Sequence, residues 1–154
     1  MNTETSMTKT NLQKILSIAG QPGLFKFVTQ ANSGVIVESL STGKRNMYGM
    51  SARLTSLSDI SIYTADEELP LLKVLESMKA ILGENDAPES KSKPEALKEF
   101  FNKVIPDYDR DRFYVSHMKK IVDWYNDLKK HASLDFEVTE ESGDAQEKEE
   151  LKDN

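Results

Sequence analysis

The chain has 154 residues, 38% of them hydrophobic and 30% charged, which suffices for one ordinary core or two small ones. It contains no cysteine, and this excludes a disulfide framework and a thiolate zinc site. No run approaches the ~20 apolar residues of a membrane span, and the N-terminus lacks the apolar core of a signal peptide. We therefore expect a cytoplasmic protein without a membrane partner.

The net charge of −6 is unevenly distributed. Residues 1–64 carry six basic and three acidic residues (+3), whereas residues 135–154 carry two basic and nine acidic residues (−7). The remaining middle part is close to neutral, at −2. A basic front half permits a polyanionic partner, and an acidic tail is typical of a solvated segment.

The front half is predicted to form short strands. Residues 23–29 and 34–41 are rich in β-branched and aromatic residues, and "QANSG" between them is typical of a hairpin turn. A second turn, "STGKR", leads into "NMYGM", and residues 56–64 indicate a helical turn followed by a strand. Together they predict a small SH3-like (Tudor-like) β-barrel domain over residues 1–64, with a flexible N-terminus, because closure removes exposed strand edges.

The alternation of apolar residues predicts a single interior for this barrel. The residues expected to line it are Leu24 or Phe25, Phe27, Val35, Val37, Leu57, Ile60 and Ile62.

The back half changes to helical spacing. Residues 65–83 are predicted to hold a helix that packs on the barrel or leaves it, with Pro70 in its first turn and Gly83 as its stop. Polar, unpatterned residues 84–93 indicate a linker. A helical domain is expected over residues 94–134.

Two helices are expected in that domain. Ser92 with Glu95 fits a capping box for the first, and Pro106 would end it. Ser116 is a candidate cap for the second, which would end near His131. The acidic tail, residues 135–154, has too few apolar residues to offset the entropy of ordering and is predicted to be disordered.

The stretch "DYDRDRFYVSHMKKIVDWY" raises the question of a metal site. Its aspartates match the D-x-D-x-D start of a calcium loop, but Arg112 stands where the loop needs glycine, and Met118 where it needs glutamate. Because arginines alternate with the aspartates, we expect a loop of local ion pairs and helix caps.

The common catalytic patterns are missing. "STGKR" contains a Gly-Lys pair, but a P-loop would also need glycine at the position of Glu38 and serine or threonine at the position of Arg45. His117 and His131 lack metal-ligand spacing. Neither a cysteine nucleophile nor G-x-S-x-G occurs. We therefore expect a protein that is not an enzyme and has no cofactor and no metal.

Several segments together carry a resemblance to a family. "LQKILSIAGQPGLFKFV", "VIVESL", "SLSDISIYTADEELPL" and "PDYDRDRFYVSHMKKIVDWYN" resemble a bacterial family of two-part proteins known only as a domain of unknown function. The resemblance implies a barrel-like N-terminal part and a helical C-terminal part. It carries no catalytic residues.

Two hypotheses for function remain open. The first is a nucleic-acid-binding module, in which cations of the barrel meet phosphates and aromatic rings stack on bases. Its candidate residues are Lys26, Lys44, Arg45, Tyr48, Arg53 and Tyr63. The alternative is a protein–protein adaptor or self-associating module, which accepts a strand or helix at the barrel or at the helix face of Trp124 and Tyr125.

Overall fold

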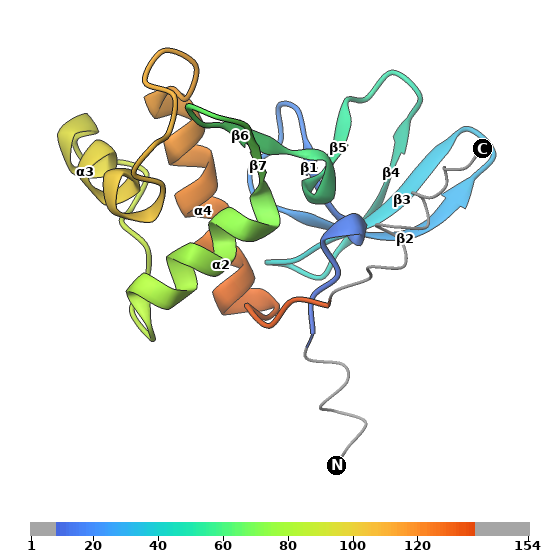
Figure 1. Cartoon of the computed structure of the whole chain (residues 1–154). Helices are drawn as coiled ribbons and strands as arrows, with labels where there is room; N and C mark the ends of the chain where they lie inside the picture. Colours follow the sequence, from blue (N-terminus) through green and yellow to red (C-terminus); the bar gives the residue numbers. More distant parts are fainter. Residues whose placement is uncertain (1–8, 138–154) are drawn as a thin grey trace.

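The structure is a computed structural model that describes residues 9–137. Over these residues the fold is α+β, with a five-stranded antiparallel sheet on one side, the helices on the other and a two-stranded hairpin between them (Figure 1). The strands are β1 (Ile15–Ile18), β2 (Phe25–Ala31), β3 (Gly34–Ser39), β4 (Arg45–Gly49), β5 (Leu54–Ser56), β6 (Ser61–Tyr63) and β7 (Glu68–Pro70). The helices are α2 (Leu71–Leu82), α3 (Pro94–Val104) and α4 (Val115–His131), and 3₁₀ turns η1 (Leu12–Lys14) and η2 (Leu57–Asp59) precede β1 and follow β5.

The predicted hairpin of β2 and β3 is confirmed. Ala31 pairs with Gly34, so Asn32 and Ser33 form a two-residue turn, which suits these residue types. Gly34 also meets a second requirement, because a Cβ there would lie 2.1 Å from the carbonyl oxygen of Tyr48 in β4. The backbones of β3 and β4 therefore approach each other too closely for any other residue.

The sheet is open rather than closed into a barrel. Its strand order is β4-β3-β2-β1-β5, and no pairing joins the edge strands β4 and β5 in the described part of the chain. In the described part of the chain, Ile18, Phe25 and Val37 form a buried cluster that belongs to the sheet alone, and the half-buried Leu16, Val35, Tyr48 and Leu54 pack against it. With three fully buried residues, the sheet's own core is small, which agrees with an open edge.

The larger core is shared by the sheet and the helices. Leu12, Ile15, Leu24 and Leu57 are buried in one cluster with residues of α2, α3 and α4. The predicted single interior is therefore wrong. Leu57 and Ile62 are buried in the shared core, Phe25 and Val37 in the core of the sheet, and Val35 and Ile60 are half-buried.

Phe27 departs from the predicted core. It is half-buried and belongs to neither cluster. The register of β2 and β3 shifts between Phe27 and Thr29, so Val28 is an extra residue in β2. Such a β-bulge breaks the inward and outward alternation on which the prediction rested.

Helix α2 is confirmed, but it begins at Leu71, so Pro70 is its N-cap residue at the end of β7 and not part of its first turn. Gly83 ends the helix with φ of 62°, a backbone conformation that favours glycine. The other two helices begin at residues that the cap predictions missed. Helix α3 starts at Pro94, with Lys93 and not Ser92 in the capping position, because proline is preorganised for the first turn. Helix α4 starts at Val115, and the N–H of Tyr114 donates to Nδ1 of His117 at 3.2 Å.

The predicted domain boundaries need correction in three places. Hairpin β6–β7 crosses the boundary at residue 64. Residues 84–93 are fastened to α4, because Asn126 accepts from the Ala87 N–H at 2.9 Å and donates to the Ala87 carbonyl at 3.2 Å. Phe136, placed in the predicted tail, is buried in the shared core. The rest of that tail, residues 138–154, lies outside the described residues.

The two phenylalanines of β2 provide a test of which of its side chains are buried in a core. We expect Phe25→Ala to lower the free energy of unfolding by about 3–5 kcal/mol, because a large buried ring is lost. Phe27→Ala should cost clearly less, since its ring is half-buried. Urea unfolding of both variants measures the difference, and equal losses would contradict the bulged register.

Gly34→Ala should lower the free energy of unfolding by about 1–3 kcal/mol, because its methyl group meets the backbone of β4. Gly49→Ala is the matched control, since Gly49 pairs with Gly34 and a Cβ there finds its nearest atom at 3.8 Å. A thermal unfolding scan compares the two, and similar losses would show that the close approach is unimportant.

Candidate functional site

Two of the predicted nucleic-acid-binding residues, Lys26 and Arg45, lie in one row of the sheet, and a third, Lys44, lies in the turn before β4. Cross-strand pairing places Ile15, Lys26, Glu38 and Arg45 in one row. Arg45 Nε lies 3.1 Å from Glu38 Oε1, so the carboxylate is paired with a cation from the neighbouring strand. Lys44 is exposed in the turn beside Arg45.

The two ends of the described chain meet at the same side of the sheet. Thr10 Oγ1 donates to the carbonyl of Ser133 at 2.7 Å, and the Thr10 N–H donates to the carbonyl of Asp135 at 2.9 Å. The N–H of Glu137 in turn donates to the Thr10 carbonyl at 2.8 Å. These bonds bring Lys9 and the segment after α4 next to the sheet.

A hollow of about 550 Å³ lies between these elements. Its lining comes from the N-terminal segment, η1, β1, β2, β3 and the end of α4. The lining residues are Lys9, Thr10, Asn11, Lys14, Ile15, Lys26, Glu38, Leu40, His131, Ala132 and Glu137. We call this feature the basic hollow.

The charges of the basic hollow are mainly positive. Lys9, Lys14 and Lys26 line it with exposed side chains, against Glu38 and Glu137. Because Glu38 is already paired with an arginine, the hollow retains an excess of positive charge suited to an anionic group.

Sequence reasoning missed Lys9, Lys14 and His131. Lys9 and Lys14 precede Lys26 by 17 and 12 residues, His131 follows it by 105, and the fold brings all of them to one hollow. The one signal available was the excess of basic residues over residues 1–64, which does not say which of them converge.

The other predicted nucleic-acid-binding residues lie elsewhere. Tyr48 is half-buried against Phe25, with ring centroids 6.1 Å apart, so it packs in the core of the sheet. Arg53 is exposed just before β5. Tyr63 lies beneath the guanidinium of Arg112, whose central carbon is 4.0 Å from the ring centroid.

Trp124 and Tyr125, the residues named for the adaptor hypothesis, belong to the shared core. Trp124 is 9% exposed and Tyr125 is fully buried. Burial raises the pKa of the Tyr125 hydroxyl, and the nearby carboxylate of Asp86 adds to this effect. The helix face that carries them is occupied by the protein's own packing.

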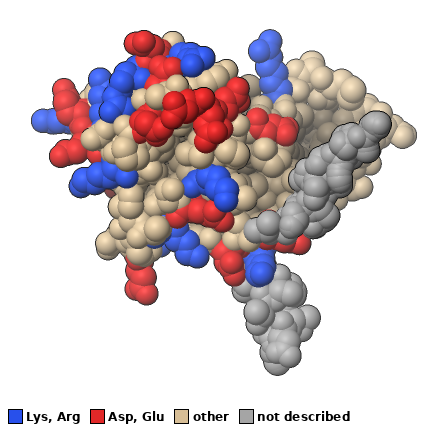
Figure 2. All heavy atoms as spheres, viewed as in Figure 1, with Lys and Arg blue, Asp and Glu red and all other residues tan. Residues whose placement is uncertain are grey.

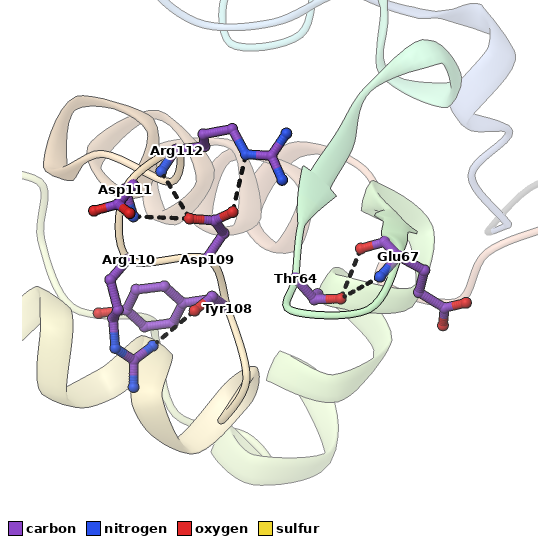
Figure 3. A network of polar contacts seen from close by, with 7 residues as sticks. All are labelled: Thr64, Glu67, Tyr108, Asp109, Arg110, Asp111 and Arg112. Atoms are coloured by element: carbon purple, nitrogen blue, oxygen red, sulfur yellow. Dashed lines mark hydrogen bonds and ion pairs between the residues drawn. The ribbon is translucent and has the colours of Figure 1, made fainter.

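The loop between α3 and α4 is a network of local contacts, as predicted (Figure 3). The Asp109 carboxylate accepts from the Asp111 N–H at 2.8 Å and from Arg112 Nε at 2.9 Å. Both interactions lower the pKa of Asp109, and the hydrogen bond from the Asp111 N–H has the larger effect. Arg110 covers the ring of Tyr108 at 3.8 Å and donates to its carbonyl. The loop therefore stabilises the helical part.

Three further observations concern metal binding, membrane insertion and surface charge. Among residues 9–137, no three histidine, aspartate or glutamate side chains are placed to hold a metal ion. No helix in this part of the chain is long and apolar enough to cross a membrane. On the face in Figure 2, basic and acidic side chains alternate over the helical part, so that face has no continuous positive surface.

Comparison with known proteins finds one matching family model for each part of the chain. Residues 12–57 match a domain of unknown function (DUF5606), and residues 60–128 match a second domain of unknown function (DUF6852). A solution NMR structure of a protein from Bacteroides vulgatus is similar, with 40% sequence identity and a TM-score of 0.65. The match covers 76% of this chain and 84% of that chain. No curated protein matches the chain.

The Asp109 network predicts a pH-dependent contribution to stability. Because the folded-state pKa of Asp109 is lowered, its contribution is present above the ordinary pKa near 4 and is lost as the pH falls through the folded value. We expect Asp109→Asn to lower the urea midpoint at pH 7 and to have little effect at about pH 2. Asp111→Asn, at an exposed neighbouring position, is the matched control. A loss that is the same at both pH values would contradict an electrostatic role.

Proposed function

The chain belongs to a family of two-part proteins of unknown function, in which a DUF5606 domain precedes a DUF6852 domain, and we propose that it is a non-enzymatic module that binds an acidic segment of a protein partner. The binding site of this proposal is the basic hollow. The partner's carboxylates would meet the lysines, and its backbone would lie along the row of Lys26, Glu38 and Arg45.

The composition of the hollow carries this proposal. Lys9, Lys14 and Lys26 come from separate elements and line one concave surface, together with the apolar side chains of Ile15 and Leu40. Several cations on one concave surface attract a ligand of opposite charge, because the protein walls around them strengthen their field. A peptide with acidic side chains and an occasional apolar one fits both parts.

A protein segment fits the hollow better than a nucleic acid does. The lining contains neither phenylalanine, tyrosine nor tryptophan, whereas binding of single strands relies on aromatic rings that stack on bases. Tyr48 and Tyr63, the rings expected to stack, lie outside the lining.

The strand order supports a finer proposal about the fold. An open sheet in the order β4-β3-β2-β1-β5, with a bulge in β2, is the arrangement that we associate with SH3-like and Tudor-like modules. Such modules bind peptides, nucleic acids or partner proteins, so the likeness agrees with a binding role without fixing the ligand.

Strand β4 supports a second candidate function, the addition of a partner strand. It is an edge of the sheet, and Met47 in it is 54% exposed. Met50, just after it, is 84% exposed. An open edge with exposed apolar side chains is the usual starting point for strand addition.

The proposal is tested with two labelled probes, a ten-residue glutamate peptide that contains one leucine and a ten-nucleotide single strand of DNA. We expect the full chain to bind the peptide more tightly in fluorescence anisotropy at low salt. The double variant Lys14→Glu with Lys26→Glu should weaken peptide binding at least about tenfold, which corresponds to about 1.4 kcal/mol.

The matched control is Lys98→Glu with Lys103→Glu, which makes the same change of charge at exposed positions on α3. This control should bind the peptide nearly as well as the unchanged chain. Equal losses in both double variants would mean that net charge, and not the hollow, governs binding. Tighter binding of the DNA strand, lost in the hollow variant, would replace the proposal with the nucleic-acid hypothesis.

A further inference from the structure

The position of Glu137 determines where the remainder of the chain begins. Glu137 lines the basic hollow, and its N–H is held by the Thr10 carbonyl at 2.8 Å. Residues 138–154 therefore start at the wall of the hollow. Any ligand that enters the hollow meets this segment at its point of attachment.

The composition of residues 138–154 complements the lining of the hollow. These seventeen residues include seven acidic residues and two lysines. Leu151 follows Glu149 and Glu150, so the segment also offers the combination of carboxylates and an apolar side chain that the lining of the hollow suits. The lining provides three lysines, and Ile15 and Leu40 provide its apolar wall.

The segment is long enough to reach every part of the hollow. Leu151 is fourteen positions after Glu137, and fourteen residues of fully extended chain reach at most about 50 Å. Attachment at the wall keeps the segment at an effective concentration on the order of millimolar near the lysines. Weak contacts suffice for substantial occupancy at this concentration.

From these observations we propose that residues 138–154 bind in the basic hollow of the same molecule and compete with the acidic partner. This proposal rests on the proposed function, because it assigns the same surface to the chain's own acidic segment. The partner displaces the segment when it binds. Because the contacts are between carboxylates and exposed lysines, the competition weakens as salt rises.

A spin label tests the contact without any partner. The chain has no cysteine, so Ala145→Cys accepts one label at a unique position. In the full chain at low salt, we expect paramagnetic broadening of the backbone amide signals of Asn11, Lys14 and Lys26. Amides of α3, such as that of Lys98, serve as the reference.

Attachment alone brings the label near the hollow, so a charge variant separates binding from tethering. Lys14→Gln with Lys26→Gln should remove most of the broadening at the hollow, as should about 0.5 M salt, where the screening length is about 4 Å. Lys98→Gln with Lys103→Gln is the matched control and should leave the broadening intact. Broadening that is the same in both double variants would overturn the proposal.

A mixed sample distinguishes contact within one molecule from contact between copies. Labelled chain without ¹⁵N is added to unlabelled chain with ¹⁵N, and we expect no broadening at the hollow. Broadening of similar strength in this sample would overturn binding within the same molecule and would indicate exchange of the segment between copies.

The competition itself is measured with the glutamate peptide. In the full chain we replace the seven acidic residues of 138–154 by their amides, as in Glu140→Gln and Asp144→Asn. This variant should bind the peptide about 2- to 10-fold more tightly at low salt, because a competitor at millimolar effective concentration is lost. Peptide binding that is unchanged, together with no charge-dependent broadening, would reject the competition and leave the proposed function standing. If even the amide variant does not bind the peptide, the proposed function itself fails.

Discussion

Leu24 and Phe25 are neighbours in the chain, yet their side chains enter different cores. Leu24 joins the core that the sheet shares with the helices, whereas Phe25 joins the small core of the sheet. Adjacent residues of an extended chain point to opposite sides, so the strands must supply apolar residues to both. The sheet then has too few for an interior of its own, and its stability depends on α2 and α4. The front part of the chain is therefore not expected to fold alone.

This dependence also explains where the basic hollow lies. The helices lie beside the sheet, with β6 and β7 between them, and α4 returns the chain to the N-terminal segment (Figure 1). Thr10 then fastens the segment after α4 with four hydrogen bonds, two of them to Ser133. The hollow is the space left where the sheet, η1 and the end of α4 meet. The pairing of β1 with β2 brings Lys14 close to Lys26, whereas the Thr10 contacts hold Glu137 beside the neighbouring Lys9.

The sequence predicts best what is decided by neighbouring residues. The turn after Ala31, helix α2 and its stop at Gly83 follow from local preferences, and all three are present. Local patterns cannot show the bulge at Val28, because register depends on the partner strand. The same limit applies to the site. Lys26, Lys44 and Arg45 lie in or beside segments whose composition predicts strands and were identified, whereas Lys9 and Lys14 precede those segments and reach the hollow through the pairing of β1 with β2 and the contacts of Thr10.

The acidity of the whole protein does not oppose an anion-binding hollow. Residues 138–154 carry −5 of the net charge of −6, which leaves −1 for residues 1–137. Residues 1–137 are thus nearly neutral as a whole, and local charges decide what binds. Screening at physiological salt limits each charge to about 8 Å, so a ligand in the hollow responds mainly to the lysines that line it. The acidic segment is attached at the same place, and this proximity is the physical basis of the proposed competition.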